Sequence, residues 1–485
     1  MGAQKSKKVL SKMPRHRCIF LSLFGLIILV LIINFYFAFV INNNKLPNPT
    51  ESPKVVYAPS RIPFASSSSS KKLIILESPM RVKDTKVALT KRTTSIEAEL
   101  KIKDILLHLP PKYSKPSVLL KTEVSKLWTY LQPSVGTSTQ LWSVAREWVG
   151  ARSIIPPRSP LLGSVLKTIS LAKIINAQNA PGGTQLKLLI TLEGGQQALF
   201  KPQWYKRDEH IEGPVYSGKD RHNAEVAAFH LALLMGLRRV PLTAGRKVNI
   251  QKEIMTVASK SLLKTFSTDD KNNTCFYGNC HYCSQSDAVC AHKNWMEGAI
   301  ILMLPSNLKL KQFRSPWQRT YRDNKAAKWE VDHKYCHNIK LNKIYNPQSG
   351  PRLLDLIDVA IFDFLIDNGD RHHYEVLSNV SGAAVMFIDN GKSFGHPFQD
   401  HLDILAPFYQ CCLIRQSTWE RLQLFTGSTL GSALEKIMST SYISPVLTSH
   451  HFAALNRRMH AVYATAELCF EKFGEGRVVV DDGYR

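Results

Sequence analysis

An apolar run followed by two aspartates, in residues 351–391, restricts the fold of this chain more than any other feature. The run PRLLDLIDVAIFDFLIDNG repeats its apolar residues at the spacing of one helix face, at Leu353, Leu354, Ile357, Ile361, Phe364 and Leu365. The spacing predicts a buried helix, and Gly369 is expected to end it in a left-handed conformation. Asp370 is then the first acid after a rigid helix. AAVMFID predicts a short strand with Asp389 at its end, so two carboxylates are expected at the ends of rigid elements.

An earlier stretch predicts a hairpin that carries two lysines. TQLKLLITL and QQALFKP have the pattern of two strands joined by Glu193-Gly194-Gly195. If the turn is centred on Gly194, Lys187 and Lys201 lie opposite each other, and two like charges across a strand pair suggest a bound anion such as phosphate. A register that differs by one residue would instead turn Lys187 to solvent. The sequence does not decide between the two registers.

The next segment predicts a helix with acids at its start. KDRHNAEVAAFHLALLMGLRR has an apolar stripe and is expected to end at Gly236. Asp220 could serve only as the helix N-cap, or Asp220 or Glu225 could face the lysines or a metal. The predicted elements follow the order of parts in kinases: first a hairpin with a lysine, then a helix with an acid, and later a helix, a loop, a strand and a second aspartate. There one acid positions the acceptor hydroxyl and the other holds the metal on the nucleotide phosphates.

The N-terminus predicts a membrane anchor. Residues 1–17 hold six basic residues and no acid, and residues 18–41 are almost wholly apolar. Because the basic flank precedes a span of bilayer length and no small-residue cleavage site follows, we expect an uncleaved signal anchor with the remainder in the lumen. Residues 42–115, rich in proline, serine and lysine, are expected to form a stem. Residues 116–485 are numerous enough for a domain of two lobes.

Eight of the nine cysteines lie beyond the anchor. An even number in an oxidising lumen favours disulfides over a zinc knuckle at Cys280-His-Tyr-Cys283. Asn272 and Asn379 begin predicted glycosylation sequons. The formal net charge is +25 and the tail supplies six positive charges, so the rest carries 25 − 6 = +19. This charge favours anionic partners such as nucleotides and acidic glycans; no nucleic acid is expected, because a luminal protein rarely meets it.

Six motifs resemble the secretory-pathway kinase family that includes the Golgi casein kinase and the glycosaminoglycan xylosylkinase. They are LFKP (199–202), DRHNAEVAAFH (220–230), CFYGNCHYC (275–283), DNGDRHHYE (367–375), IDNGKSFG (388–395) and YQCCLIR (409–415). The resemblance runs from about residue 141 to the C-terminus. It implies an α+β, atypical two-lobed kinase-like fold with disulfide-bonded insertions, preceded by one transmembrane helix. The amino-terminal lobe would reach about residue 300, and the carboxyl-terminal lobe would begin at about 305.

The resemblance also implies a location and a set of disulfides. The chain is expected in the Golgi membrane as a single-pass type II protein with its catalytic domain in the lumen. The implied disulfide pairs are Cys275–Cys290, Cys280–Cys283, Cys336–Cys411 and Cys412–Cys469.

Roles for single residues follow from the same resemblance. Asp370 would be the catalytic acid or base, and Lys187 and Lys201 would contact the nucleotide. Asp220 and Asp389 are expected at the metal and nucleotide. Glu375 is expected at the nucleotide too, where ordinary protein kinases have asparagine. Its extra carboxylate suits Mn²⁺ or Mg²⁺ beside ATP. The hinge under the adenine would be formed by Ile301, Leu302, Met303 and Leu304.

Several stretches are closer to the xylosylkinase branch than to the protein-kinase branch. They are GGTQLKLLITLEGGQ, GPVYSGKDRHNAEV, SGPRLLDLID and RQSTWERL. In this comparison Asp220 stands where the protein-kinase branch typically has glutamate, and Trp419 where it has tyrosine. The Trp419 indole is expected either to stack on a sugar ring or to belong to the core.

The implied activity is transfer of the ATP γ-phosphate to the 2-hydroxyl of xylose in the linkage region of proteoglycans. The alternatives are a secreted-protein serine kinase, a lipid kinase, and an inactive nucleotide-binding activator of a related kinase. The sequence leaves the oligomeric state open.

Overall fold

The computed structural model describes residues 93–485 except 135, 323–324 and 484–485. The predicted cytosolic tail, the predicted transmembrane anchor and residues 42–92 of the predicted stem lie outside the described residues. Within the described part, no helix combines the length and apolar character needed to cross a membrane.

Five antiparallel strands form the main sheet of the amino-terminal lobe, in the order β1-β2-β3-β8-β4. Their bounds are Ile174–Asn179 for β1, Leu188–Leu192 for β2, Gln196–Pro202 for β3, Thr243–Asn249 for β4 and Trp295–Leu302 for β8. Strands β2 and β3 form the predicted hairpin, and its turn needs glycine because Gly194 and Gly195 have φ of 86° and 79°. Leu188 pairs with Phe200. Lys187 and Lys201, one position further along, therefore lie opposite each other, as one of the two predicted registers requires.

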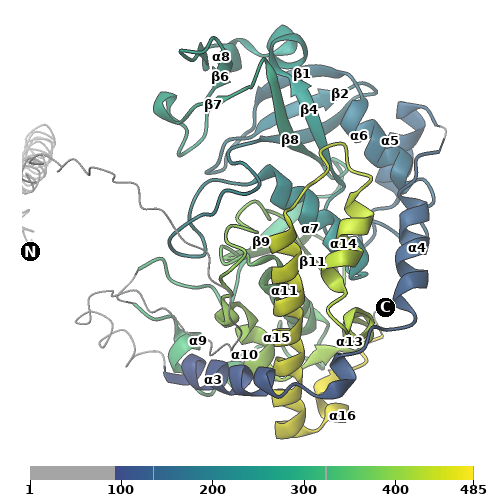
Figure 1. Cartoon of the computed structure of the whole chain (residues 1–485), viewed down its shortest axis with the longest axis vertical. Helices are drawn as coiled ribbons and strands as arrows, with labels where there is room; N and C mark the ends of the chain where they lie inside the picture. The colour runs from purple at the N-terminus through teal and green to yellow at the C-terminus, as the bar shows by residue number, and fades with distance from the viewer. Residues whose placement is uncertain (1–92, 135, 323–324, 484–485) are drawn as a thin grey trace, which may run out of the picture. The chain divides into compact units, whose positions relative to one another are not determined.

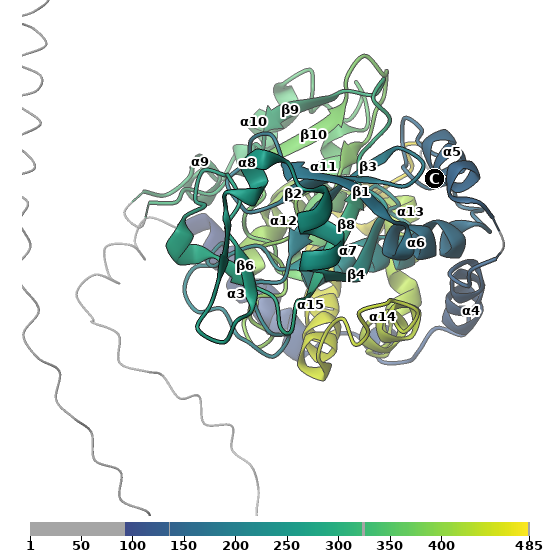
Figure 2. The same ribbon diagram turned by 90° about the horizontal axis from the view of Figure 1, so that it is seen from above.

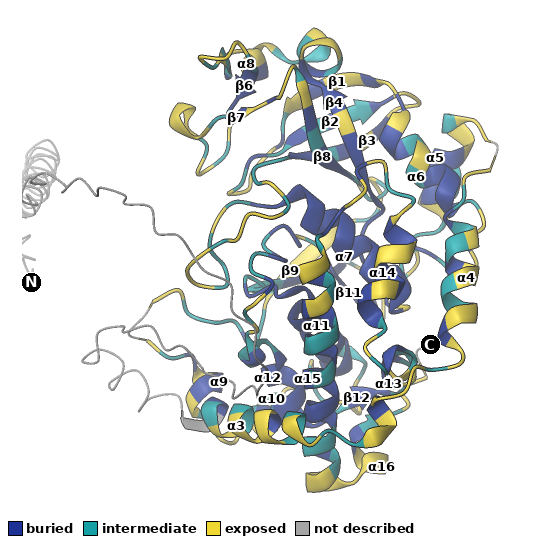
Figure 3. Ribbon diagram, viewed as in Figure 1, coloured by how far each residue is buried: buried dark blue, intermediate teal, exposed yellow. Residues whose placement is uncertain are grey.

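Helix α7 (His222–Leu234) lies in the core beneath this sheet. All of its 13 residues are buried, and it packs on β4 and β8 (Figures 1 and 2). Figure 3 shows α7 in the colour of buried residues throughout. The helix ends before Gly236, whose φ is 72°, as predicted. Asp220 is not its N-cap, because that position belongs to Arg221.

Three helices on the amino-terminal side precede or flank the sheet. They are α4 (Leu120–Tyr130), α5 (Ser138–Glu147) and α6 (Leu162–Leu171). A smaller insertion holds α8 (Lys260–Leu263) and a three-stranded sheet of β5 (Phe266–Thr268), β6 (Thr274–Phe276) and β7 (Val289–Cys290).

Helix α11 (Arg352–Ile366) forms the centre of the carboxyl-terminal lobe, with every residue after Arg352 buried. It packs against α12 (Ala406–Cys411) and α15 (Ser449–Phe473). The other helices of this part of the chain are α9 (Lys328–Val331), α10 (Tyr335–Leu341), α13 (Gln416–Leu422), α14 (Leu430–Met438) and α16 (Glu475–Val478). A three-stranded sheet has the order β11-β10-β9, with bounds Val385–Met386, His373–Leu377 and Leu310–Arg314. Strands β12 (Ile414–Arg415) and β13 (Val479–Val480) pair in parallel.

The predicted helix in residues 351–366 is confirmed, but its predicted end is wrong. Asp367, with φ of 57°, takes the left-handed position. Gly369 is needed for another reason, since a Cβ there would lie 2.0 Å from Cγ1 of Val215. The predicted strand before Asp389 is reduced to Val385–Met386.

The folded domain also begins earlier than predicted. Helix α3 (Thr93–Leu107) packs against α15, and Ile102 is fully buried. The Tyr113 ring stacks on Tyr463 at 4.4 Å between centroids. The prediction assigned these residues to the stem because residues 42–115 as a whole are rich in proline, serine and lysine.

All four implied disulfides are present: Cys275–Cys290, Cys280–Cys283, Cys336–Cys411 and Cys412–Cys469. The zinc-knuckle alternative is therefore wrong, because both of its sulfurs are bonded to each other. Asn272 and Asn379 are exposed, and their glycosylation remains a prediction.

Buried histidines should make the domain lose stability as the pH falls below neutral. Burial lowers the pKa of His230 and of His451 from 6.5 to about 4. The unfolded state then binds more protons, so stability is lost as the pH falls from about 6.5 towards 4. At pH 5 each histidine should cost roughly 2 kcal/mol. Urea unfolding at pH 7 and pH 5 measures this loss. His230→Gln should reduce the loss of unfolding free energy between pH 7 and pH 5. His108→Gln, which changes an exposed histidine, should leave that loss unchanged. Equal losses in the two variants would contradict the prediction.

Candidate active site

One lysine joins three carboxylates between the two lobes. The Lys201 ammonium on β3 lies 2.8 Å from Asp220 Oδ2, 2.6 Å from Glu225 Oε1 and 2.9 Å from Asp389 Oδ1. Asp220 precedes α7, Glu225 lies in its first turn, and Asp389 follows β11. The fold therefore brings together three of the predicted residues and adds Glu225, which the sequence offered only as an alternative to Asp220.

The charges of this cluster determine which groups are ionised. Burial disfavours the Lys201 ammonium, but Asp220, Asp389 and Glu225 outweigh it and raise the Lys201 pKa well above its ordinary value. Burial raises the pKa of Glu225, and the nearby Lys201 opposes that rise. The Lys201 charge lowers the pKa of Asp389. Asp389 is thus the ionised carboxylate that opens onto solvent, with 78% of its side chain exposed.

The same carboxylates fit a hard divalent cation. Oxygens of Asp220, Glu225 and Asp389 all lie within 4.8 Å of one another. Three carboxylates beside one ammonium leave an excess of negative charge. A donor set made only of oxygen is the set that Mg²⁺ and Mn²⁺ prefer.

A cleft of about 730 Å³ opens beside this cluster, within the size range of ligand pockets. The predicted hinge residues line the cleft together with Lys187, Lys201, Glu375 and Asp389. At the hinge, the Met303 N–H donates to the Gln197 carbonyl at 3.0 Å, and the Gln196 amide donates to the Met303 carbonyl at 3.3 Å. Asp220 does not line the cleft and is only 4% exposed.

Glu375 and Lys187 reach the cleft from different lobes. Glu375 lies on β10, where its carboxylate accepts a hydrogen bond of 3.0 Å from Gln312. It does not belong to the group of three carboxylates around Lys201. The Lys187 charge contributes to the lowered pKa of Asp389, so both hairpin lysines act on the same carboxylate.

A half-buried arginine, Arg371, fixes the segment that carries Asp389. Arg371 donates to Asp363 at 2.9 Å and to Asn390 Oδ1 at 2.9 Å. The Asn390 N–H donates in turn to Glu225 at 3.1 Å. Arg371 thus connects α11 to the residue next to Asp389, and Asn390 connects that residue to α7. The sequence analysis missed this role; the signal was Asp363, an acid on the apolar face of α11 that needs a partner when buried.

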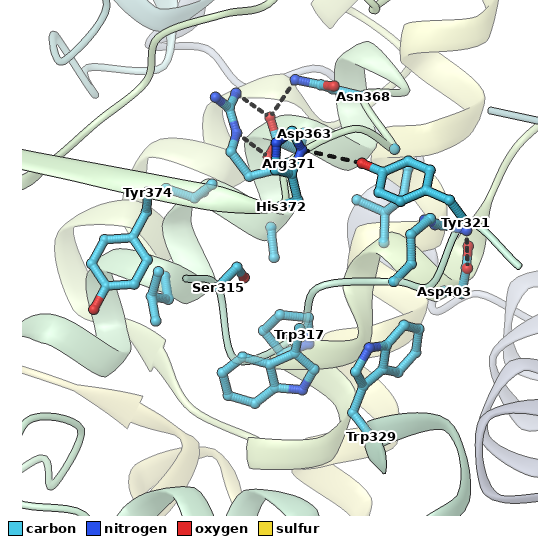
Figure 4. A pocket seen from close by; sticks show the side chains of 17 residues that line it. Ser315, Trp317, Tyr321, Trp329, Asp363, Asn368, Arg371, His372, Tyr374 and Asp403 are labelled. Atoms are coloured by element: carbon cyan, nitrogen blue, oxygen red, sulfur yellow. Dashed lines mark hydrogen bonds and ion pairs between the residues drawn. The ribbon is translucent and has the colours of Figure 1, made fainter. Parts of the chain in front are cut away.

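Asp370 lies outside the main cleft and contacts an aromatic loop. The Tyr321 hydroxyl donates to Asp370 Oδ1 at 2.5 Å and lies 3.1 Å from His372 Nδ1. Asp370 raises the pKa of His372 by accepting a hydrogen bond from it. Figure 4 shows the Tyr321 hydroxyl pointing directly at His372, and both residues line a small cavity together with Trp317 and Trp329. The cavity measures about 60 Å³, enough for a few waters but not for a sugar ring.

The prediction that Trp419 stacks on a sugar is wrong. Trp419 lies on α13 and is 3% exposed. Its ring packs edge-on against Phe470 at 5.3 Å and Tyr463 at 6.4 Å. No face of the indole is free, so the alternative reading as a core residue is the correct one.

The fold and the site together define a kinase-like phosphotransferase, with a strand lysine paired to a helix glutamate and an aspartate after a short strand. Residues 140–478 match the family described as "Golgi casein kinase, C-terminal, Fam20", and the chain belongs to this family. It is 49% identical over 342 residues to the human glycosaminoglycan xylosylkinase, covering 70% of this chain and 83% of that protein.

Two solved structures share the fold. The structure of hydra Fam20 with sugar is 44% identical, with a TM-score of 0.69, and the match covers 71% of this chain and 99% of that chain. The crystal structure of the Golgi casein kinase with Mn/ADP bound is 30% identical, with a TM-score of 0.67. That match covers 77% of this chain and 95% of the other.

Proposed function

We propose that this chain is an ATP-dependent glycan kinase that phosphorylates the 2-hydroxyl of xylose in the linkage region of proteoglycans. The observation that carries the proposal is the 49% identity to the human glycosaminoglycan xylosylkinase. The intact set of Lys201, Glu225 and Asp389 supports an active enzyme over an inactive activator.

The residues of the cleft and of the adjacent carboxylate cluster have distinct roles in this proposal. The adenine lies at Ile301–Leu304, and Lys187 and Lys201 offset the negative charge of the phosphates. Lys201 can do so because its raised pKa keeps it protonated. Asp220, Glu225 and Asp389 would hold Mn²⁺ or Mg²⁺, which when bound supplies further positive charge at the phosphates. Glu375 faces the same cleft, and its carboxylate suits a divalent cation beside the phosphates.

Asp370 completes the chemistry as the acceptor of the proton from the sugar hydroxyl. It follows the buried end of α11 and is held by the Asn368 side chain, which accepts its N–H at 3.2 Å. General-base catalysis of this kind contributes roughly 10² to 10⁴ in rate.

The proposal includes the compartment. A domain with four disulfides fits the oxidising lumen of the secretory pathway. With the signal anchor predicted at residues 18–41, the chain would be a type II protein of the Golgi membrane that meets xylose-containing glycans on proteoglycan core proteins.

The position of the new phosphate tests the function. The full chain with ATP and Mn²⁺ should phosphorylate a galactose-xylose oligosaccharide, and NMR of the product should place the phosphate on the xylose 2-oxygen. A matched oligosaccharide with 2-deoxyxylose should remain unmodified. Phosphate on galactose, or equal transfer to the 2-deoxy acceptor, would refute the assignment.

Tyr321 should compete with the acceptor for Asp370. Its hydroxyl, 2.5 Å from Asp370, occupies the position that an acceptor hydroxyl must reach. A hydrogen bond to a charged group is worth about 1.5–3 kcal/mol. Tyr321→Phe should therefore lower the KM for the glycan by about tenfold or more, without changing the KM for ATP. Steady-state kinetics with each substrate varied in turn measures both values, and a higher glycan KM in the variant would contradict the competition.

A further inference from the structure

A second large cavity lies outside the nucleotide cleft. It measures about 510 Å³ and is bounded by α4, residues 152–157, the end of α7 and α13. No residue lines both cavities, although Arg239 lines this one and its neighbour Val240 lines the cleft. The volume is within the range of about 300–1,000 Å³ found for ligand pockets.

The cavity is lined by six cations: Lys126, Arg152, Arg238, Arg239, Arg415 and Arg421. Four of these arginines are held by four carboxylates. Asp355 and Asp358 of α11 pair with Arg152, Arg239 and Arg415, Asp482 also pairs with Arg415, and Glu123 pairs with Arg421. Asp355 also lies 3.9 Å from Arg352, which does not line the cavity. Lys126 and Arg238 are the two lining cations that have no carboxylate within 4.0 Å among the described residues.

Arg238 is a half-buried guanidinium with no carboxylate among the described residues within 4.0 Å. Its side chain donates one hydrogen bond, to the Pro156 carbonyl at 2.9 Å, although a guanidinium has five N–H groups. Burial and the nearby charge of Arg421 lower its pKa to about 10. Its φ is 45°, an unusual value for a residue with a side chain. Partial burial of the charge and the positive φ are both unfavourable for an arginine, and Arg238 lines the cavity in spite of them.

Structural roles account for Arg421 but not for Arg238. Arg421 donates a hydrogen bond of 2.8 Å to the carbonyl of Leu234, the last residue of α7, which has no partner within the helix. The charge of Arg421 is balanced by Glu123, whose carboxylate lies 2.8 Å away. Arg238 and Lys126 have no ion pair of this kind among the described residues, although their charges help to lower the pKa of Glu123. Both line the same cavity as Tyr130.

We propose that this cavity binds an oxyanion group, namely the sulfate, phosphate or carboxylate of a ligand no larger than a short saccharide, between Arg238 and Lys126. Guanidinium groups bind such anions through paired N–H donors. The volume admits a sugar-sized body beyond the anionic group. This site does not depend on the proposed acceptor, and its failure would leave the proposed function intact.

Calorimetric binding to the full chain tests the site. The cleft is first filled with ADP and Mn²⁺, so that Lys187 and Lys201 do not contribute. Inorganic sulfate, inorganic phosphate and a sulfated uronate-containing disaccharide are then titrated at constant ionic strength against chloride. We expect one saturable site. Arg238→Gln should weaken it by about tenfold or more, and Lys126→Gln should weaken it less.

Lys260→Gln, which removes one exposed charge on α8, is the control and should bind like the wild type. Tighter binding of the disaccharide than of sulfate would assign a glycan ligand, and binding of the inorganic ions alone would assign a free anion. Lys126→Gln keeps the test valid if Arg238→Gln fails to fold, because Lys126 is exposed. Absence of saturable binding, or equal binding by the wild type and Lys126→Gln, would overturn the proposal.

Discussion

Replacing Asp370 by asparagine should reduce phosphate transfer by about 10² to 10⁴. Replacing Asp389 should also reduce transfer, but only the Asp389 change should weaken nucleotide binding. Asp389 belongs to the carboxylate group that fits a divalent cation, and it lines the cleft. Asp370 lies beyond the cleft and contacts Tyr321 instead. Turnover with the glycan and calorimetric binding of ADP with Mn²⁺ separate the two effects.

The matched control for this pair is Asp104→Asn, which removes an exposed carboxylate of α3 and should leave both measurements unchanged. Loss of nucleotide binding in Asp370→Asn, or retention of full Mn²⁺-dependent binding in Asp389→Asn, would contradict the division of roles.

Removing either long-range disulfide should bring the domain close to unfolding. Cys336–Cys411 and Cys412–Cys469 join residues 75 and 57 positions apart. Closing loops of this length stabilises a protein by about 4 kcal/mol each in the chain-entropy account. A domain has a total stability of about 5–15 kcal/mol, so each loss is a large fraction of it. Urea unfolding of Cys336→Ser/Cys411→Ser and of Cys412→Ser/Cys469→Ser measures the loss.

The short Cys280–Cys283 bridge, with a separation of three residues, is the internal control and should cost about 2 kcal/mol. If its removal destabilised the domain as much as removal of the long bridges, loop closure would not be the source of their effect.

The sequence predicted the elements whose pattern is local. The α7 and α11 helices follow from their apolar residues, and the hairpin follows from Gly194 and Gly195, which adopt the positive φ that its turn requires. The sequence alone does not determine the register of this hairpin, because only the observed pairing of β2 with β3 shows that Lys187 lies opposite Lys201. The disulfide pairs came from the family resemblance, since spacing alone does not select one connectivity.

Tertiary contacts decided the rest of the site. Both Asp220 and Glu225 contact Lys201, and neither is the N-cap of α7. Glu225 reaches Lys201 because α7 is buried against the sheet, with the first turn of the helix next to β3. Trp419 could not be assigned from sequence because an indole serves equally well in a core or on a sugar platform. Tyr321 reaches Asp370 from 49 positions away, and no local pattern predicts such a contact.

The choice of acceptor tests the central claim most directly, because the fold does not distinguish a glycan kinase from a protein kinase. The TM-scores to hydra Fam20 with sugar and to the Golgi casein kinase are 0.69 and 0.67. The measurement is kcat/KM of the full chain for a galactose-xylose linkage oligosaccharide and for an acidic casein-like peptide, with the same ATP and Mn²⁺. We predict that the glycan is preferred by about a hundredfold or more, since a site built to bind sugar hydroxyls leaves its polar groups unpaired with a peptide. A higher kcat/KM for the peptide would contradict the claim and assign the chain to the protein-kinase branch.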